Sequence, residues 1–118
     1  DKYPKLEKML KRIPSFESRA VNFFVKEEYV KDFKSEFEKV FKDKFLLLSR
    51  EEILKGKLFG EGSQNSHIRE TLGDYMAFGI SDVALEWEDK NKKIIARHAG
   101  LTEEEMTVPL IIIDTKNV

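Results

Sequence analysis

Aromatic residues at every fourth position dominate residues 27–44. They would lie on one face of an α-helix, and two valines widen the same apolar stripe. A basic and aromatic mixture can also form a nucleic-acid surface, but these aromatic residues occupy the stripe that a helix buries, and acids match the lysines. We therefore expect a helix here that packs on the core. The residues of the stripe are Tyr29, Val30, Phe33, Phe37, Val40 and Phe41.

Extended segments flank this helix on both sides. Residues 19–26 alternate like a strand with a large apolar load, and residues 45–48 form a short apolar run typical of a buried strand. A strand, a helix and a strand in this order permit a right-handed crossover. Before this unit, residues 4–13 carry apolar side chains at helical spacing, and Pro14 ends the pattern.

The middle of the chain holds a short helix and a loop. Ser49 and Glu52 have the spacing of a capping box that opens a helix through Lys55, and Gly56 is the expected terminator. Residues 58–65 are polar and glycine-containing, which indicates a loop. The glycine spacing matches neither a dinucleotide-binding nor a Walker phosphate loop.

Further strands are expected beyond that loop. Residues 75–80 and 83–87 are predicted to form a hairpin, and residues 94–96 a strand after a charged turn. The crossover unit and the hairpin together predict an α/β (mixed α+β) fold, in which helices flank a mixed sheet.

The last segment combines a capped helix with an apolar run. Thr102 and Glu105 have capping-box spacing, and Leu101 and Met106 sit where a hydrophobic staple would hold the helix entry. Pro109 cannot continue that helix. The next four residues are all apolar, which is typical of a strand covered on both faces. This run is Leu110, Ile111, Ile112 and Ile113.

Composition excludes several classes of protein. The chain has 118 residues, a formal net charge of −1 and no cysteine. The near-balanced charge gives no general attraction to nucleic-acid polymers or to an anionic membrane, and we expect neither as a partner. No apolar run approaches the roughly 20 residues that span a bilayer, and no disulfide can form. We expect one domain or a fragment of one, cytoplasmic in location.

The sequence His-Ala-Gly-Leu-Thr-Glu-Glu-Glu-Met over residues 98–106, followed by Val-Pro-Leu-Ile, resembles a known motif. It is similar to the carboxy-terminal signature of the alkaline phosphatase superfamily, in the branch of type I phosphodiesterases and nucleotide pyrophosphatases. Residues 17–21, 58–60 and 72–75 extend the resemblance upstream in register. The resemblance implies that residues 1–118 are the carboxy-terminal part of a larger phosphoesterase with an alkaline-phosphatase-like fold.

The resemblance assigns one role in this chain directly. The histidine of the signature is His98, which the family would use as one ligand of a centre of two divalent metal ions, with zinc the expected metal. Without the resemblance, a lone histidine beside a glycine is more often structural. In the family, a hydroxyl nucleophile held on the metals attacks the phosphoester, and metal-bound water hydrolyses the phospho-enzyme.

Other parts of the family's machinery have no counterpart in the sequence. The Thr or Ser nucleophile and the Asp-His pair are missing, since Asp74 is followed by Tyr75 and neither Asp82 nor Asp89 has a histidine beside it. The metal site in this chain would therefore be incomplete. We expect that these 118 residues alone do not turn over substrate and contain no catalytic nucleophile.

His67 and Arg69 are a second candidate site. They could approach a phosphate of the substrate, one as a hydrogen-bond donor and the other as a bidentate fork. The alternative is an exposed loop histidine beside an ordinary surface pair of Arg69 with Glu70.

Three hypotheses follow. The first is a piece of a cytoplasmic metal-dependent hydrolase acting on a phosphodiester, a nucleotide pyrophosphate or a phosphomonoester, with the rest of the parent chain as a partner. The second is a non-catalytic α/β binding or scaffolding module. The third is a separately folded cap or lid within the parent protein.

Overall fold

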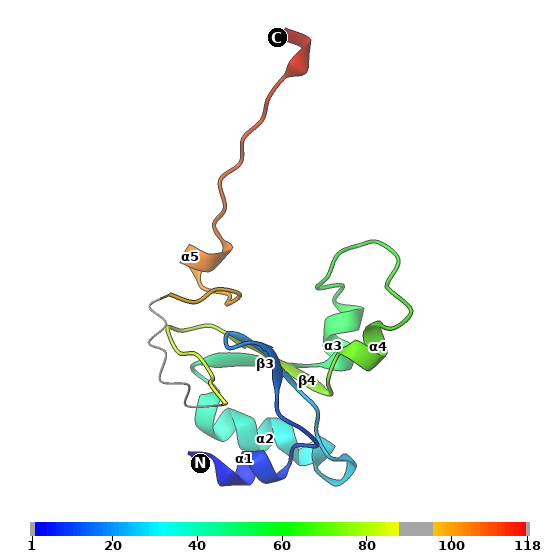
Figure 1. Cartoon of the computed structure of the whole chain (residues 1–118), viewed down its shortest axis with the longest axis vertical. Helices are drawn as coiled ribbons and strands as arrows, with labels where there is room; N and C mark the ends of the chain where they lie inside the picture. Colours follow the sequence, from blue (N-terminus) through cyan, green and yellow to red (C-terminus); the bar gives the residue numbers. More distant parts are fainter. Residues whose placement is uncertain (1, 88–95, 118) are drawn as a thin grey trace.

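A four-stranded sheet organises the fold (Figure 1), and the computed structural model describes residues 2–87 and 96–117. The strands lie in the order β1-β2-β4-β3, and each neighbouring pair is antiparallel. The strands are β1 Ser15–Glu17, β2 Ala20–Phe23, β3 Phe45–Ser49 and β4 Tyr75–Gly79. The helices are α1 Pro4–Lys8, α2 Val30–Phe41, α3 Arg50–Lys55, α4 Ile68–Thr71 and α5 Glu103–Met106, with short 3-10 turns η1 at Glu27–Tyr29 and η2 at Thr115–Asn117.

One face of the sheet carries the larger core, which α1 and α2 cover. The phenylalanines of the stripe predicted on α2 are buried as expected, with Phe33 and Phe37 at 0% and 1% exposure, whereas Val40 of the same stripe is 40% exposed. Their rings pack on Phe23 of β2 at centroid distances of 5.3 and 5.5 Å. Inward-facing side chains of the strands complete this core, namely Val21, Phe23, Phe45, Leu47, Tyr75 and Ala77.

The opposite face carries a smaller core beneath α3 and α4. Ile53 and Leu54 of α3 pack there on the alternate residues of the strands. The capping box predicted at the start of α3 is present, since Ser49 Oγ accepts from the Glu52 amide and Glu52 Oε2 accepts from the Ser49 amide. Strand residues on this face are Ala20, Leu48, Met76 and Phe78.

A buried asparagine joins β2 to the turn before β4. Asn22 is 1% exposed, accepts from the Gly73 amide at 2.7 Å and donates to the Thr71 carbonyl at 3.1 Å. A Cβ on Gly73 would overlap the carbonyl oxygen of Phe23, so this close approach requires glycine. The side chain of Asn22 thus satisfies two backbone groups that the turn leaves unpaired.

The mixed α+β class is confirmed, but the expectation of a mixed sheet is wrong for the described strands. Strands β2 and β3 do run parallel, as a crossover through α2 requires, yet β4 lies between them and pairs antiparallel with both. Insertion of β4 therefore replaces the parallel pair by two antiparallel pairs. The sequence did not reveal that β4 lies between β2 and β3, because any of the predicted strands could have occupied the centre of the sheet.

Two strand expectations are also wrong. Residues 83–87 form no strand beside β4; Val83 and Leu85 instead pack at the edge of the larger core. Residues 110–113 are extended but pair with none of the described strands, and their side chains are 73–83% exposed. The strand expected at residues 94–96 falls largely outside the described residues. None of the described helices has the length and apolar character that crossing a membrane requires.

Candidate functional site

Arg19 and Glu105 form an ion pair that ties the carboxy-terminal signature to the sheet. Arg19 Nε lies 2.6 Å from Glu105 Oε1, and Arg19 Nη2 lies 2.7 Å from Glu105 Oε2. The two side chains are only 6% and 16% exposed. The planar guanidinium matches both carboxylate oxygens, which makes this bidentate pair geometrically specific as well as charge-assisted.

Backbone groups complete the attachment around this pair. Arg19 Nη1 donates to the Val83 carbonyl at 2.8 Å, and the Leu101 amide donates to the Gly79 carbonyl at 2.7 Å. Glu105 Oε1 also accepts from the Gly100 amide at 3.0 Å. The segment around α5 is therefore held to β4 by one backbone hydrogen bond and to the residue preceding β2 by the ion pair of Glu105.

The predicted capping box of α5 is part of the same cluster. Thr102 donates to Glu105 Oε2 from its amide at 3.3 Å and from its hydroxyl at 2.8 Å. One carboxylate thus caps its own helix and binds Arg19 simultaneously. The capping role was predicted from the spacing, whereas the bond to Arg19 was not.

Glycine at position 100 makes this arrangement possible. A Cβ on Gly100 would overlap Oε2 of Glu105 and Nη2 of Arg19, and a Cβ on Gly79 would lie 3.0 Å from Cζ of Arg19. The ion pair closes directly over these two backbone positions. Gly100 in the signature therefore has a steric explanation, since a side chain there would separate the two charges.

The ion pair shifts the ionisation of both groups. The hydrogen bond with Arg19, followed by those from Thr102 and Gly100, lowers the pKa of Glu105 from 4.5 to about 2. The same hydrogen bond raises the pKa of Arg19. Both groups stay charged throughout the physiological range, so the pair acts as a permanent connection.

His98 lies next to this attachment and points into solvent. Its side chain is 80% exposed, and Nε2 lies 3.9 Å from Oε2 of Glu17. Ala99 connects His98 to Gly100. Its backbone lies in the left-handed region with φ of 73°, a conformation that a residue with a Cβ adopts rarely. The imidazole is therefore presented on an exposed turn whose carboxy-terminal side is anchored.

These residues alone do not make a metal centre. Within the described ranges, no three His, Asp or Glu side chains come together as a metal would require. His98 and the neighbouring Glu17 supply at most two ligand-type groups. The described residues thus do not fit a two-metal site by themselves, and any such site would need ligands from elsewhere.

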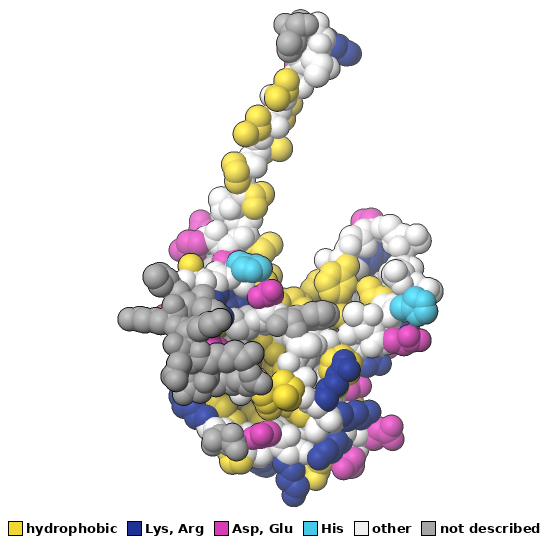
Figure 2. All heavy atoms as spheres, in the orientation of Figure 1, with side chains coloured by type: hydrophobic (Ala, Val, Ile, Leu, Met, Phe, Trp, Pro, Cys, Tyr) yellow, Lys and Arg dark blue, Asp and Glu magenta, His cyan; other side chains and the backbone are white. Residues whose placement is uncertain are grey.

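The second candidate pair lies apart from His98. His67 Nδ1 lies 3.3 Å from Glu70 Oε2, and Arg69 forms a pair with Glu51 at 2.6 Å. Both side chains are largely exposed. Figure 2 shows the two histidines of the chain well separated on the surface. The fold does not bring His67 and Arg69 together with His98.

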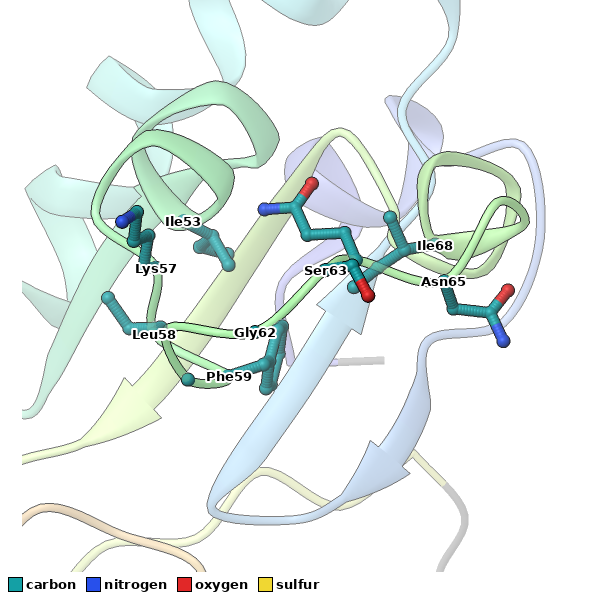
Figure 3. A pocket seen from close by; sticks show the side chains of 10 residues that line it. Ile53, Lys57, Leu58, Phe59, Gly62, Ser63, Asn65 and Ile68 are labelled. Atoms are coloured by element: carbon teal, nitrogen blue, oxygen red, sulfur yellow. The ribbon is translucent and has the colours of Figure 1, made fainter.

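A small pocket lies beside α3. It has a volume of about 130 Å³ and is lined mainly by the loop at residues 57–65 together with Ile53 and Ile68 (Figure 3). The one cation in its lining, Lys57, pairs with Glu61 at 2.5 Å. Neither His67 nor Arg69 lines it, so the pocket does not join the candidate phosphate-binding pair.

Sequence reasoning missed the importance of Arg19. The signals were present, because Arg19 directly precedes an apolar strand and Glu105 belongs to a capped turn. Nothing local linked them, since their separation of 86 positions leaves many other acids as possible partners.

Comparison of the chain with family models, curated proteins and solved structures found no match.

Proposed function

We propose that this chain is part of a metal-dependent phosphoester hydrolase, to which it contributes His98 as one metal ligand. The observation that carries the proposal is the Arg19–Glu105 pair. Both residues belong to stretches on which the resemblance to type I phosphodiesterases rests, and the pair holds those stretches together. The partly buried ion pair supports the proposal, because it makes the distant stretches of the resemblance one structural unit.

The exposure of His98 is consistent with a ligand that binds a metal shared with another part of the protein. A neutral imidazole must offer an unhindered ring nitrogen to a metal, and Nε2 of His98 faces solvent with one carboxylate near it. When bound, divalent metals would supply Lewis-acid chemistry at a phosphoester. The chain's own contribution is to orient His98 through the turn that Gly100 and Glu105 anchor.

The test uses the complete polypeptide that carries this sequence. Hydrolysis of bis(p-nitrophenyl) phosphate and p-nitrophenyl phosphate is measured with added zinc, together with the zinc content of the purified protein. We expect His98→Ala to lower both zinc content and hydrolysis, the latter by more than roughly 100-fold, since loss of outer partners alone costs about 10- to 100-fold. Undiminished hydrolysis in this variant would remove the ligand assignment.

Glu104→Gln is the matched control, because Glu104 is an exposed acid of the same segment. It should leave zinc content and hydrolysis unchanged. If the wild-type polypeptide hydrolyses neither ester, the hydrolase proposal fails. Preference for the diester or the monoester would identify the substrate class.

A binding or scaffolding module is the second candidate, favoured by a different observation. Residues 108–113 form an extended apolar segment that projects from the rest of the chain (Figure 1). An exposed apolar segment of this kind would serve as an interaction element whether or not the protein is an enzyme. Retained binding through this segment in a protein without hydrolase activity would favour the module.

A further inference from the structure

Residues 99–107, which we call the strap, are fastened to the sheet by polar contacts rather than by a core. Among the described residues, neither core cluster includes a side chain of the strap. Its two large apolar side chains stay at the surface, since Leu101 is 38% and Met106 is 60% exposed. Figure 1 shows α5 set apart from the other α-helices. The strap therefore closes without the apolar burial that fixes α2 and α3.

Helix α3 shows what the strap lacks. It begins with the same kind of capping box, formed by Ser49 and Glu52, but it also buries Ile53 and Leu54 in the smaller core. In α5, all four residues stay partly or fully exposed. Segments with few buried apolar contacts open at a lower free energy than the strands of a core. We therefore expect the strap to open while the sheet stays folded.

The strap begins at a strained backbone position. Ala99 has φ of 73°, and strain of this kind persists only where surrounding contacts hold it. Two contacts hold it here. The Gly100 amide donates to Glu105 Oε1 at 3.0 Å, and the Leu101 amide donates to the Gly79 carbonyl at 2.7 Å. Loss of these bonds would release the strain at Ala99, which favours movement of the strap as one unit.

Opening of the strap would take the carboxylate away from Arg19. Nε and Nη2 of Arg19 donate to Glu105, whereas Nη1 donates to the carbonyl of Val83, which lies outside the strap. The Arg19 side chain is only 6% exposed in the closed state. A cation in such a place that loses its partner keeps the cost of desolvation without the compensating attraction. The bond to Val83 would hold the guanidinium in place, ready to bind another oxyanion.

We propose that Arg19 is a carboxylate-binding site with Glu105 as its tethered occupant, and that a carboxylate of another molecule can replace Glu105 and hold the strap open. The planar guanidinium matches the two oxygens of a carboxylate, as the pair with Glu105 shows. Both groups stay charged near neutral pH, so exchange of one carboxylate for another, rather than protonation, opens the strap. An open strap also frees the turn that bears His98. This site would bind carboxylates whether or not the chain belongs to a hydrolase.

Hydrogen exchange of the 118-residue chain tests the strap in the wild-type sequence. The amides of Gly100 and Leu101 should show equal protection, roughly 100-fold or more below that of Val21 and Ala77, which lie opposite each other on the two central strands. Protection as high as that of Val21 and Ala77 would show that the strap opens only with the whole fold. Protection that differs more than about tenfold between Gly100 and Leu101 would show that they do not open together. Either result would overturn the proposal.

Removal of the tethered carboxylate tests the chemistry of the site. In Glu105→Ala, acetate should shift the NMR resonance of Arg19 Nε in a saturable way, because acetate supplies the two oxygens that the substitution removes. Acetamide, a neutral molecule of similar shape, should cause no such shift. The Nε resonance of Arg69, which pairs with Glu51 at the surface, is the matched reference and should stay unchanged. Equal responses to acetate and acetamide, or a larger response to phosphate, would overturn the carboxylate assignment.

Replacement of Glu105 is tested in the wild-type chain. Sodium acetate at about 0.5 M should speed exchange of the Gly100 and Leu101 amides about twofold or more over sodium chloride at the same concentration, since mass action doubles the open population when acetate reaches its dissociation constant. The Val21 and Ala77 amides should respond equally to the two salts. Equal rates for Gly100 and Leu101 in the two salts would overturn the proposed replacement.

Discussion

Arg19 and Glu105 lie 86 positions apart in sequence, yet their side chains form a bidentate pair with N–O distances of 2.6 and 2.7 Å. Glu105 also caps α5 through Thr102 and accepts from the Gly100 amide. A single carboxylate thus joins a helix start, a glycine turn and the residue that precedes β2. The position of the turn that bears His98 depends on this group together with the backbone bond from the Leu101 amide to the Gly79 carbonyl.

The first prediction concerns removal of the carboxylate charge. Glu105→Gln keeps the shape of the side chain but cannot accept two charge-assisted bonds from Arg19. The amides of Gly100 and Leu101 should then exchange roughly tenfold or more faster, because the segment opens locally more often. Glu104→Gln, which changes an exposed acid one position earlier, should leave both amides unaffected. Equal effects of the two substitutions would rule out the pair as the anchor.

The second prediction concerns pH. The pKa of Glu105 is lowered from 4.5 to about 2 in the folded chain, so its carboxylate stabilises the fold fully above pH 4.5. This contribution is lost progressively as the pH falls from about 4.5 towards 2. The Glu105 carboxyl carbon, followed by NMR, should therefore titrate near pH 2. Glu105→Gln should flatten the fall in the free energy of unfolding over that range; an unaltered pH dependence would contradict the assignment.

The third prediction concerns the glycine beneath the ion pair. Gly100→Ala places a methyl group where Glu105 and Arg19 meet, so the pair must separate or the turn must shift. We expect a loss of about 1–3 kcal/mol in the free energy of unfolding, measured by urea titration. Gly62→Ala is the control, because a Cβ there meets no atom within 4 Å. Equal stabilities of the two variants would show that the close contact at Gly100 is unimportant.

The fourth prediction concerns the aromatic core. Phe37 is 1% exposed and packs against the rings of Phe23, Phe33, Phe41 and Phe45. Phe37→Ala should lower the free energy of unfolding by about 3–5 kcal/mol, since a cavity remains in the packed cluster.

Phe59→Ala provides the comparison for this core substitution. Phe59 is 59% exposed in the loop after α3, so its truncation should change stability by less than about 1 kcal/mol. Thermal or urea unfolding of the 118-residue chain measures the change in the free energy of unfolding for both variants. Similar losses for the two variants would mean that Phe37 does not belong to the main core.

Local patterns account for what the sequence predicted well. The stripe on α2 follows from helical spacing, and the capping boxes at Ser49 and Thr102 each need only two residues three positions apart. Strands β2 and β3 were recognisable for a similar reason, as short apolar runs beside that helix. Each of these features depends on residues only a few positions apart, so the local sequence is enough to predict it.

The sequence by itself thus determined helices α1, α2, α3 and α5, strands β2, β3 and β4, and the caps, whereas tertiary structure decided how they combine. The position of β4 between β2 and β3, the Asn22 bridge to Gly73 and the ion pair of Arg19 with Glu105 all join distant residues. Each such contact must overcome the entropy of closing a long loop, and many alternative partners have the same local chemistry. Residues 110–113 show the same limit, because their apolar pattern predicts a covered strand, whereas the fold leaves them exposed and outside the described sheet.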